Sequence, residues 1–290
     1  MSSTSKATTP FTDPNSEQMT MSLLRKHKLA ELADRHDLYQ RSVQDTETEI
    51  DFILETWNGL RKRPAELLRE DFCGTANTAC EWVRRDPRHF AIGIDLDGEV
   101  LQWGQQHNVS HLSSEEQHRL ELITGNVLDD LQERADIVLA MNFSYFLFRT
   151  RDELRGYFSS VHAGLAKDGI FFLDAYGGYD APRELEETRE CDDFVYIWDQ
   201  AEFNPIDSCM TCHIHFEFVD GSRMDKAFSY YWRLWTLPEI REILLEAGFR
   251  RADVYWEGTD EETEEGNGEY QPREIGEADA GWVCYIVAQA

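Results

Sequence analysis

The sequence predicts an α/β fold in which helices cover a mostly parallel sheet. The first observation is that short apolar segments alternate with amphipathic segments between residues 65 and 175. The second is a tight turn of small residues, Cys73–Ala76, which ends one apolar segment and precedes a helical pattern. The third is Ala135–Met141, which is apolar at almost every position, as expected for a central strand buried on both faces.

The chain before the first strand predicts helices. Apolar residues recur at helical spacing from Leu23 to Trp57, with a break near Ser42–Thr46. Residues 1–22 are polar and rich in Ser and Thr, and we expect them to form a disordered leader. We expect residues 23–290 to form one domain, of which residues 23–63 are N-terminal helices.

The repeat of strands and helices then follows in order. The expected strands are Ala65–Asp71, Phe90–Asp95, Arg119–Thr124, Ala135–Met141 and Ile170–Ala175. The expected helices between them are Thr75–Arg85, Glu99–Gln106 and Arg151–Leu165.

Residues 180–235 interrupt this repeat. Cys209–Val219 and Met224–Trp235 flank Asp220-Gly221-Ser222, which predicts a β-hairpin within an insertion that acts as a lid over the acceptor. The expected elements after it are a helix, a strand, an acidic loop and a closing strand, at Leu237–Ala247, Ala252–Trp256, Glu257–Ala280 and Gly281–Ala288.

The turn after the first strand points to an adenosine-containing cofactor. It lets a ligand approach the backbone, and the N-terminus of the next helix faces that ligand. Asp95 ends the second strand about 25 residues later, as in nucleotide-binding βαβ units, and its carboxylate can accept from both ribose hydroxyls. A dinucleotide needs G-x-G-x-x-G, but Gly74 is the one glycine in the turn. A ligand without phosphates is therefore favoured.

This order of elements resembles the class I S-adenosylmethionine-dependent methyltransferases. Their first motif is an acidic residue followed by G-x-G-x-G, which Glu70, Phe72, Gly74 and Ala76 match in part. The resemblance implies a Rossmann-like seven-stranded, mostly parallel sheet with an antiparallel last strand and the β-hairpin insertion. With the segment Asn142–Leu147 after the fourth strand, the sequence resembles most closely the small-molecule N-methyltransferases of the glycine and sarcosine type.

The resemblance also implies the site. The cofactor, S-adenosyl-L-methionine, is expected to contact Glu70, Phe72, Gly74, Ala76, Asp95, Leu96, Asn126, Val127, Met141 and Tyr39. Within this set, the Asn126 side chain is expected beside the adenine. The candidates for the catalytic wall around the acceptor are Tyr145, Asp174 and Tyr176. Packing at strand ends is the alternative for these three side chains, and packing of a helix is the alternative for Tyr39.

Composition limits the partners. The net charge of −28 would repel a phosphate backbone, so a nucleic-acid substrate is disfavoured. No apolar run reaches the ~18–20 residues of a membrane span. The six cysteines, without an export signal, predict reduced thiols in a cytoplasmic protein. The Cys209-x-x-Cys212-His213-x-His215 pattern lacks a second ligand pair, so we expect no metal.

These observations predict a methyltransferase that acts on a nitrogen, oxygen or sulfur atom of a small molecule. The alternatives are an enzyme that methylates a protein or tRNA, a non-catalytic protein that binds the cofactor, and a nicotinamide-dependent oxidoreductase. The missing G-x-G-x-x-G motif argues against the last of these. The acidic loop Glu257–Ala280 either steers cationic acceptors or is solvated surface. The sequence does not determine the oligomeric state.

Overall fold

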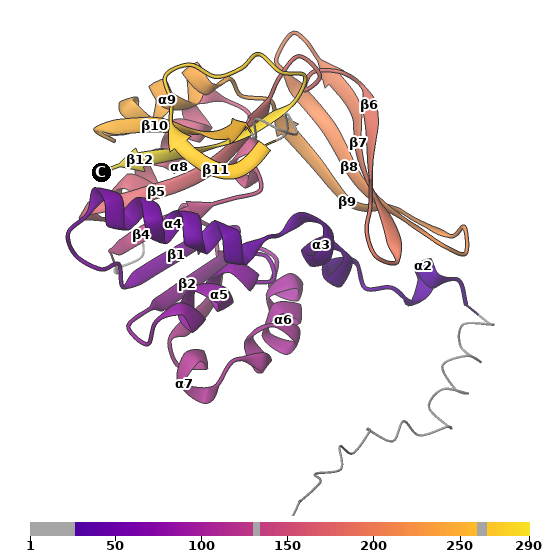
Figure 1. Ribbon diagram of the computed structural model, residues 1–290, viewed down its shortest axis with the longest axis horizontal. Coiled ribbons are helices and arrows are strands. Elements are labelled where there is room, and N and C mark those ends of the chain that lie inside the picture. The colour runs from indigo at the N-terminus through magenta and orange to yellow at the C-terminus, as the bar shows by residue number, and fades with distance from the viewer. Residues whose placement is uncertain (1–26, 130–133, 260–265) are drawn as a thin grey trace, which may run out of the picture.

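A computed structural model describes residues 27–129, 134–259 and 266–290. The expected disordered leader, residues 1–22, lies outside the described residues. Figure 1 shows two sheets, a large one covered by helices and a smaller one that extends from it toward the N-terminal helix α2. None of the helices in the described part of the chain is long and apolar enough to span a membrane.

The large sheet has the order β11-β10-β12-β5-β4-β1-β2-β3. Its strands are β1 (Leu67–Asp71), β2 (Phe90–Asp95), β3 (Leu120–Thr124), β4 (Ala135–Ala140), β5 (Leu165–Gly177), β10 (Arg251–Thr259), β11 (Gly266–Pro272) and β12 (Trp282–Gln289). The strands β1 to β5 pair in parallel, and β12 lies antiparallel between β5 and β10. The expected mostly parallel sheet with an antiparallel last strand is therefore confirmed.

The sheet has one strand more than the seven expected. Strand β11 pairs antiparallel with β10 at the edge of the sheet. It lies within the stretch expected to be a loop, because its residues are polar and mostly exposed and so carry no strand-like alternation. Residues 260–265, which hold five of the ten acidic residues of the expected loop Glu257–Ala280, lie outside the described residues.

Helices pack on both faces of the large sheet. They are α2 (Leu29–Leu32), α3 (Arg35–Val43), α4 (Thr46–Leu60), α5 (Asn77–Arg85), α6 (Gly98–His107), α7 (Ser114–Gln117), α8 (Arg151–Gly164) and α9 (Leu237–Glu246), with 3-10 turns η1 (Val109–His111) and η2 (Ser144–Leu147). One core cluster contains Tyr157 of α8 and Ile243 of α9, and the other contains Trp57 of α4 and Trp82 of α5. The expected break between the first helices falls at Asp45, whose side chain caps α4 by accepting from the Thr48 N–H.

The insertion after β5 is larger than the expected hairpin. It is a four-stranded antiparallel sheet of β6 (Leu185–Glu190), β7 (Phe194–Asn204), β8 (Cys209–Phe218) and β9 (Arg223–Arg233). The expected hairpin corresponds to β8 and β9. The prediction missed β6 because all but one of its residues are exposed and it has no apolar face.

The N-terminal helices connect the two sheets. Leu38 of α3 packs with Ile214 and Phe216 of the small sheet. On its other side, α3 contacts the turn after β1, where the Gln40 side chain donates to Thr75 Oγ1 at 2.6 Å. The carboxyl edge of the large sheet therefore lies under α3 and faces the small sheet (Figure 1).

Candidate active site

The turn after β1 has the backbone of a glycine-rich loop. The φ angles of Phe72, Gly74 and Ala76 are 58°, 52° and 55°, so all three residues adopt the left-handed backbone conformation. An L-residue pays about 1–2 kcal/mol for this conformation. The Phe72 ring packs on Tyr157, with ring centroids 5.5 Å apart, and the Ala76 methyl group is fully buried. Packing therefore stabilises Phe72 and Ala76 at two positions where the methyltransferase family that this sequence resembles has glycine.

The space above this turn is open, and Asp95 lies beside it. A Cβ placed on Gly74 would meet no atom of the described residues within 4 Å. Asp95 accepts from the Gly74 N–H at 2.8 Å and from the Asp97 N–H at 2.9 Å, each through a different oxygen. Each oxygen keeps a second lone pair for a ligand donor. Leu96 follows with 75% of its surface exposed.

Glu70 anchors the helix that follows the turn. Its carboxylate accepts from the Ala79 N–H in the first turn of α5 at 2.9 Å. The side chain is buried, and burial raises the pKa of Glu70 to about 8. The structure thus shows Glu70 ordering the loop and helix from beneath.

The remaining candidates for cofactor contact lie at neighbouring strand ends. Asn126 is exposed, and its side-chain oxygen accepts from the Leu128 N–H at 3.0 Å. Val127 is buried beside it, and Met141 directly follows β4. Tyr39 of α3 lines a cavity described below. The predicted residues therefore come together along one edge of the sheet, as carboxyl ends of parallel strands do.

Asp174 holds the loop after β4. Its two carboxylate oxygens accept from the Asn142 N–H at 2.7 Å and the Phe143 N–H at 2.8 Å. Asn142 and Phe143 have φ angles of 56° and 57°, so this carboxylate stabilises two successive left-handed residues. Burial raises the pKa of Asp174 to about 7.

The two tyrosines predicted for the acceptor wall differ in position. Tyr176 lines the cavity, and its hydroxyl donates to Met210 Sδ at 3.1 Å. Tyr145 is fully buried, and its hydroxyl donates to the Asp174 carbonyl at 2.7 Å. The structure thus places Tyr145 behind the wall, where it supports Asp174. Nothing in its local sequence distinguishes these two roles.

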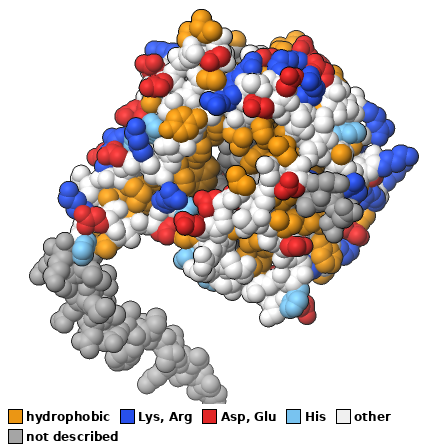
Figure 2. Space-filling view, turned by 180° about the vertical axis from the view of Figure 1, so that it is seen from behind, with side chains coloured by type: hydrophobic (Ala, Val, Ile, Leu, Met, Phe, Trp, Pro, Cys, Tyr) orange, Lys and Arg blue, Asp and Glu red, His pale blue; other side chains and the backbone are white. Residues whose placement is uncertain are grey.

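A cavity of about 870 Å³ separates the large sheet from the small one. Its aromatic lining residues are Tyr39, Phe143, Tyr176, Tyr196, Trp198, Tyr230, Trp232, Tyr270, Trp282 and Tyr285. Figure 2 shows the molecule hollowed between its parts, with hydrophobic side chains gathered around the hollow. Tyr230 and Trp232 line the cavity, while Tyr231 between them is 65% exposed, as the alternation of a strand requires.

Sequence reasoning missed a buried carboxylate in this cavity. Glu49 of α4 lines it with a side chain that is nearly buried, and its Oε2 lies 3.4 Å from Thr78 Oγ1. Burial, and next the charge of Asp174, raise the pKa of Glu49 to about 8. The available signal was its spacing, because Glu49 shares the helical stripe of Ile53 and Trp57, which are both buried.

The histidines of β8 have protein partners. The Lys226 N–H donates to His215 Nδ1 at 2.9 Å, which leaves the proton of the neutral ring on Nε2, 3.2 Å from the Asp199 carboxylate. His213 Nδ1 lies 2.8 Å from Ser229 Oγ. Glu186, Asp199 and His215 bring potential ligand atoms within 4.8 Å of one another. Since Nε2 then donates to Asp199, the geometry favours a hydrogen bond here over a metal site.

Comparison with known proteins supports the fold. No protein-family model matches the sequence, and neither does a curated protein. An S-adenosylmethionine-dependent methyltransferase from Clostridium acetobutylicum has a TM-score of 0.63 and 16% identity, covering 88% of this chain and 96% of that chain. The sugar N-methyltransferase KedS8 from Streptoalloteichus has a TM-score of 0.61 and 14% identity, covering 100% and 99%.

A third solved structure, DesVI from Streptomyces venezuelae, has a TM-score of 0.61 and 16% identity and covers 88% of this chain and 98% of that one. At such identities the likeness shows the fold alone. The chain therefore has the Rossmann-like fold of the class I S-adenosylmethionine-dependent methyltransferases. The finer likeness to glycine- and sarcosine-type enzymes stays a prediction, because the similar structures also include a glycopeptide N-methyltransferase.

Proposed function

We propose that this protein uses S-adenosylmethionine to methylate an amine of a small molecule. The observation that carries the proposal is the aromatic cavity at the carboxyl ends of β4 and β5, which the buried side chains of Glu49 and Asp174 line. The fold of the solved methyltransferases supports it, and one of these is a sugar N-methyltransferase. A small molecule fits better than a nucleic acid, because the chain carries a net charge of −28.

The residues of the turn fit the cofactor. Asp95 retains lone pairs for the ribose hydroxyls, and the exposed Leu96 offers an apolar surface for the adenine. Asn126 and Val127 complete the adenine side, and the open space over Gly74 accommodates the methionine portion. When bound, the cofactor supplies a methyl group on a sulfonium that is already activated, so transfer depends mainly on orientation.

The protein's own task is to present an uncharged amine. An ammonium has no lone pair, so the acceptor nitrogen must lose a proton before the new C–N bond forms. Glu49 is placed to take this proton, because its carboxylate lines the cavity and its pKa is raised to about 8. The oxygens of Asp174 bind two backbone N–H groups, so we assign Asp174 to positioning the loop after β4.

The aromatic residues that line the cavity favour binding of the amine in its protonated form. Ring faces attract ammonium groups, by about 0.5–2 kcal/mol per contact depending on solvent exposure. Trp198, Tyr230 and Trp232 form one such group of rings, with centroids 4.4 Å apart for the last two. An amine bound there lies in the same cavity as Glu49, whose ionised form can accept its proton.

Two measurements test this function. Calorimetry with S-adenosylmethionine, S-adenosylhomocysteine and NAD should show binding of the first two. Incubation with methyl-labelled S-adenosylmethionine and matched amines, alcohols and thiols should label amines. Labelled alcohols or thiols would contradict the choice of nitrogen. Binding without labelling of any acceptor would favour the non-catalytic alternative, and binding of NAD alone would favour the oxidoreductase.

A further inference from the structure

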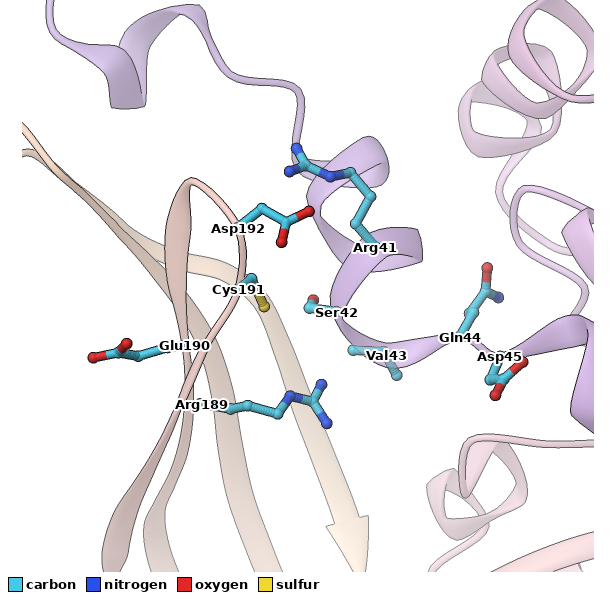
Figure 3. Close-up of a pocket in the computed structure, with 9 residues that line it drawn as sticks. All are labelled: Arg41, Ser42, Val43, Gln44, Asp45, Arg189, Glu190, Cys191 and Asp192. Atoms are coloured by element: carbon cyan, nitrogen blue, oxygen red, sulfur yellow. The ribbon is translucent and has the colours of Figure 1, made fainter. Parts of the chain in front are cut away.

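A second cavity, of about 510 Å³, adjoins the first at the end of α3 (Figure 3). It lies between the α3–α4 junction and the turn that joins β6 to β7. Val43 and Arg189 line both cavities. A molecule that fills the large cavity and extends past these two residues therefore enters the smaller one.

Arg189 is the one cationic residue among those that line the large cavity. Its side chain is exposed, and its guanidinium lies over the Tyr196 ring, 5.2 Å from the centroid. Within the described ranges of the chain, no acidic side chain forms an ion pair with Arg189. Figure 3 shows the Arg189 side chain pointing toward Val43, whereas Glu190 points away on the other face of the strand.

The nearby Arg41, unlike Arg189 within the described residues, forms ion pairs with acidic side chains. It forms ion pairs with Asp37, at 3.4 Å, and with Asp193, so its charge is already neutralised by protein groups. Arg189 therefore offers a guanidinium that has no ion-pair partner among the described residues, at the point where the two cavities meet, although Asp45 and Asp192 also line the smaller cavity. The planar fork of guanidinium N–H groups suits a carboxylate or phosphate, which can accept two parallel hydrogen bonds.

We propose that Arg189 binds an anionic group, a carboxylate or a phosphate, carried by the methyl acceptor. The proposal rests on the function proposed above and narrows its substrate class to amines that carry a negative charge at a distance from the nitrogen. Glu49 and Arg189 would then bind opposite ends of one molecule. The charge of Arg189 disfavours a cation at this end of the cavity. Glu187 lines the same cavity two residues before Arg189, so its carboxylate reduces the gain from binding an anion.

The test uses the full chain saturated with S-adenosylhomocysteine. It is titrated with amino carboxylates, aminoalkyl phosphates and amino alcohols of matched chain length, with the fluorescence of the cavity tryptophans as readout. We expect wild type to bind the anionic members about tenfold more tightly than the neutral ones. This factor is at the lower end of the range for a hydrogen bond to a charged group, because Arg189 is exposed to solvent. Comparison of the carboxylate and phosphate series then identifies the anion.

Two variants test whether Arg189 causes the preference for anionic over neutral amines. Arg189→Gln should abolish it and leave binding of the amino alcohols unchanged. Arg223→Gln is the matched control, because Arg223 is an exposed arginine of the same sheet that pairs with Asp225 outside the cavity. Equal binding of anionic and neutral compounds by wild type would overturn the proposal, as would a preference that survives in Arg189→Gln.

Methyl transfer to the same compounds separates this proposal from the function on which it rests. If Arg189-dependent binding is found but no amine in the series is methylated, the subsite stands and the proposed activity fails. If amines are methylated at equal kcat/KM with and without the anionic group, the activity stands and the subsite is wrong.

Discussion

Replacing Glu49 with Gln tests the proposed proton acceptor directly. Gln has nearly the same shape, and its side-chain oxygen can still accept from Thr78, which lies 3.4 Å away. Because burial raises the pKa of Glu49 to about 8, the carboxyl is mostly neutral at pH 7, and the substitution removes little charge there. We therefore expect the variant to fold with a Tm close to that of wild type.

The size of the effect follows from this pKa. A positioned general base contributes about 10²–10⁴ in rate. With a pKa of about 8, roughly one tenth of Glu49 is ionised at pH 7 and most of it at pH 9. Because the variant depends on amine that has already lost its proton in solution, the ratio of wild-type to variant kcat should be about 100 below pH 8, taking the lower bound for a general base, and should fall above it. Above pH 8 the amine increasingly loses its proton in solution, so the variant needs the base less.

The assay is the initial rate of methyl transfer to one amine from pH 6 to pH 10, at saturating S-adenosylmethionine. Calorimetry gives the cofactor Kd of each variant at the same pH values. Glu55→Gln is the control, since Glu55 is an exposed glutamate on the same helix α4. A kcat ratio that does not change with pH would refute the role of Glu49 as base. A weakened cofactor Kd with unchanged kcat would instead make it a cofactor ligand.

Further substitutions test the turn after β1 and the residues that support it. Asp95→Ala should weaken S-adenosylmethionine binding by about 1–3 kcal/mol by calorimetry, and an unchanged Kd would place the ribose contact elsewhere. Ala76→Val should lower the free energy of unfolding in urea by about 2 kcal/mol or more, because a β-branched residue is strained at φ 55°. Ala76→Gly should stay within about 1 kcal/mol of wild type. Equal losses in the two variants would contradict the left-handed backbone at this position. Asp71→Asn should cost about 3–5 kcal/mol in the same assay, since it leaves the buried Arg69 without a charged partner. The triple change of Arg69→Met, Asp71→Leu and Tyr157→Phe should recover most of this, because it also removes the buried hydroxyl that donates to Asp71. A neutral single change would show that the pair is solvated.

Much of the fold could be predicted because its signals are local. The turn after β1, the acid that ends β2 and the apolar strand β4 each lie within a few consecutive residues. The hairpin of β8 and β9 was recognised from its alternation and its Asp-Gly-Ser turn. In contrast, β6 and β11 are polar edge strands whose backbone hydrogen bonds, and not an apolar face, hold them in their sheets. Such strands leave little pattern in a sequence.

The candidate site divides in the same way. The sequence by itself determined that Gly74 and Asp95 meet at one edge of the sheet, because they belong to adjacent βα units whose strand ends lie side by side. The large cavity was decided by the tertiary structure alone. It joins Glu49 of α4, Asp174 of β5 and Arg189 of β6, which lie far apart in the chain. Burial raises the pKa values of the two carboxylates, and the charge of Asp174 adds to the shift of Glu49. The packing of the small sheet against α3 brings Arg189 to the same cavity. Both effects depend on distances that arise only when the two sheets come together.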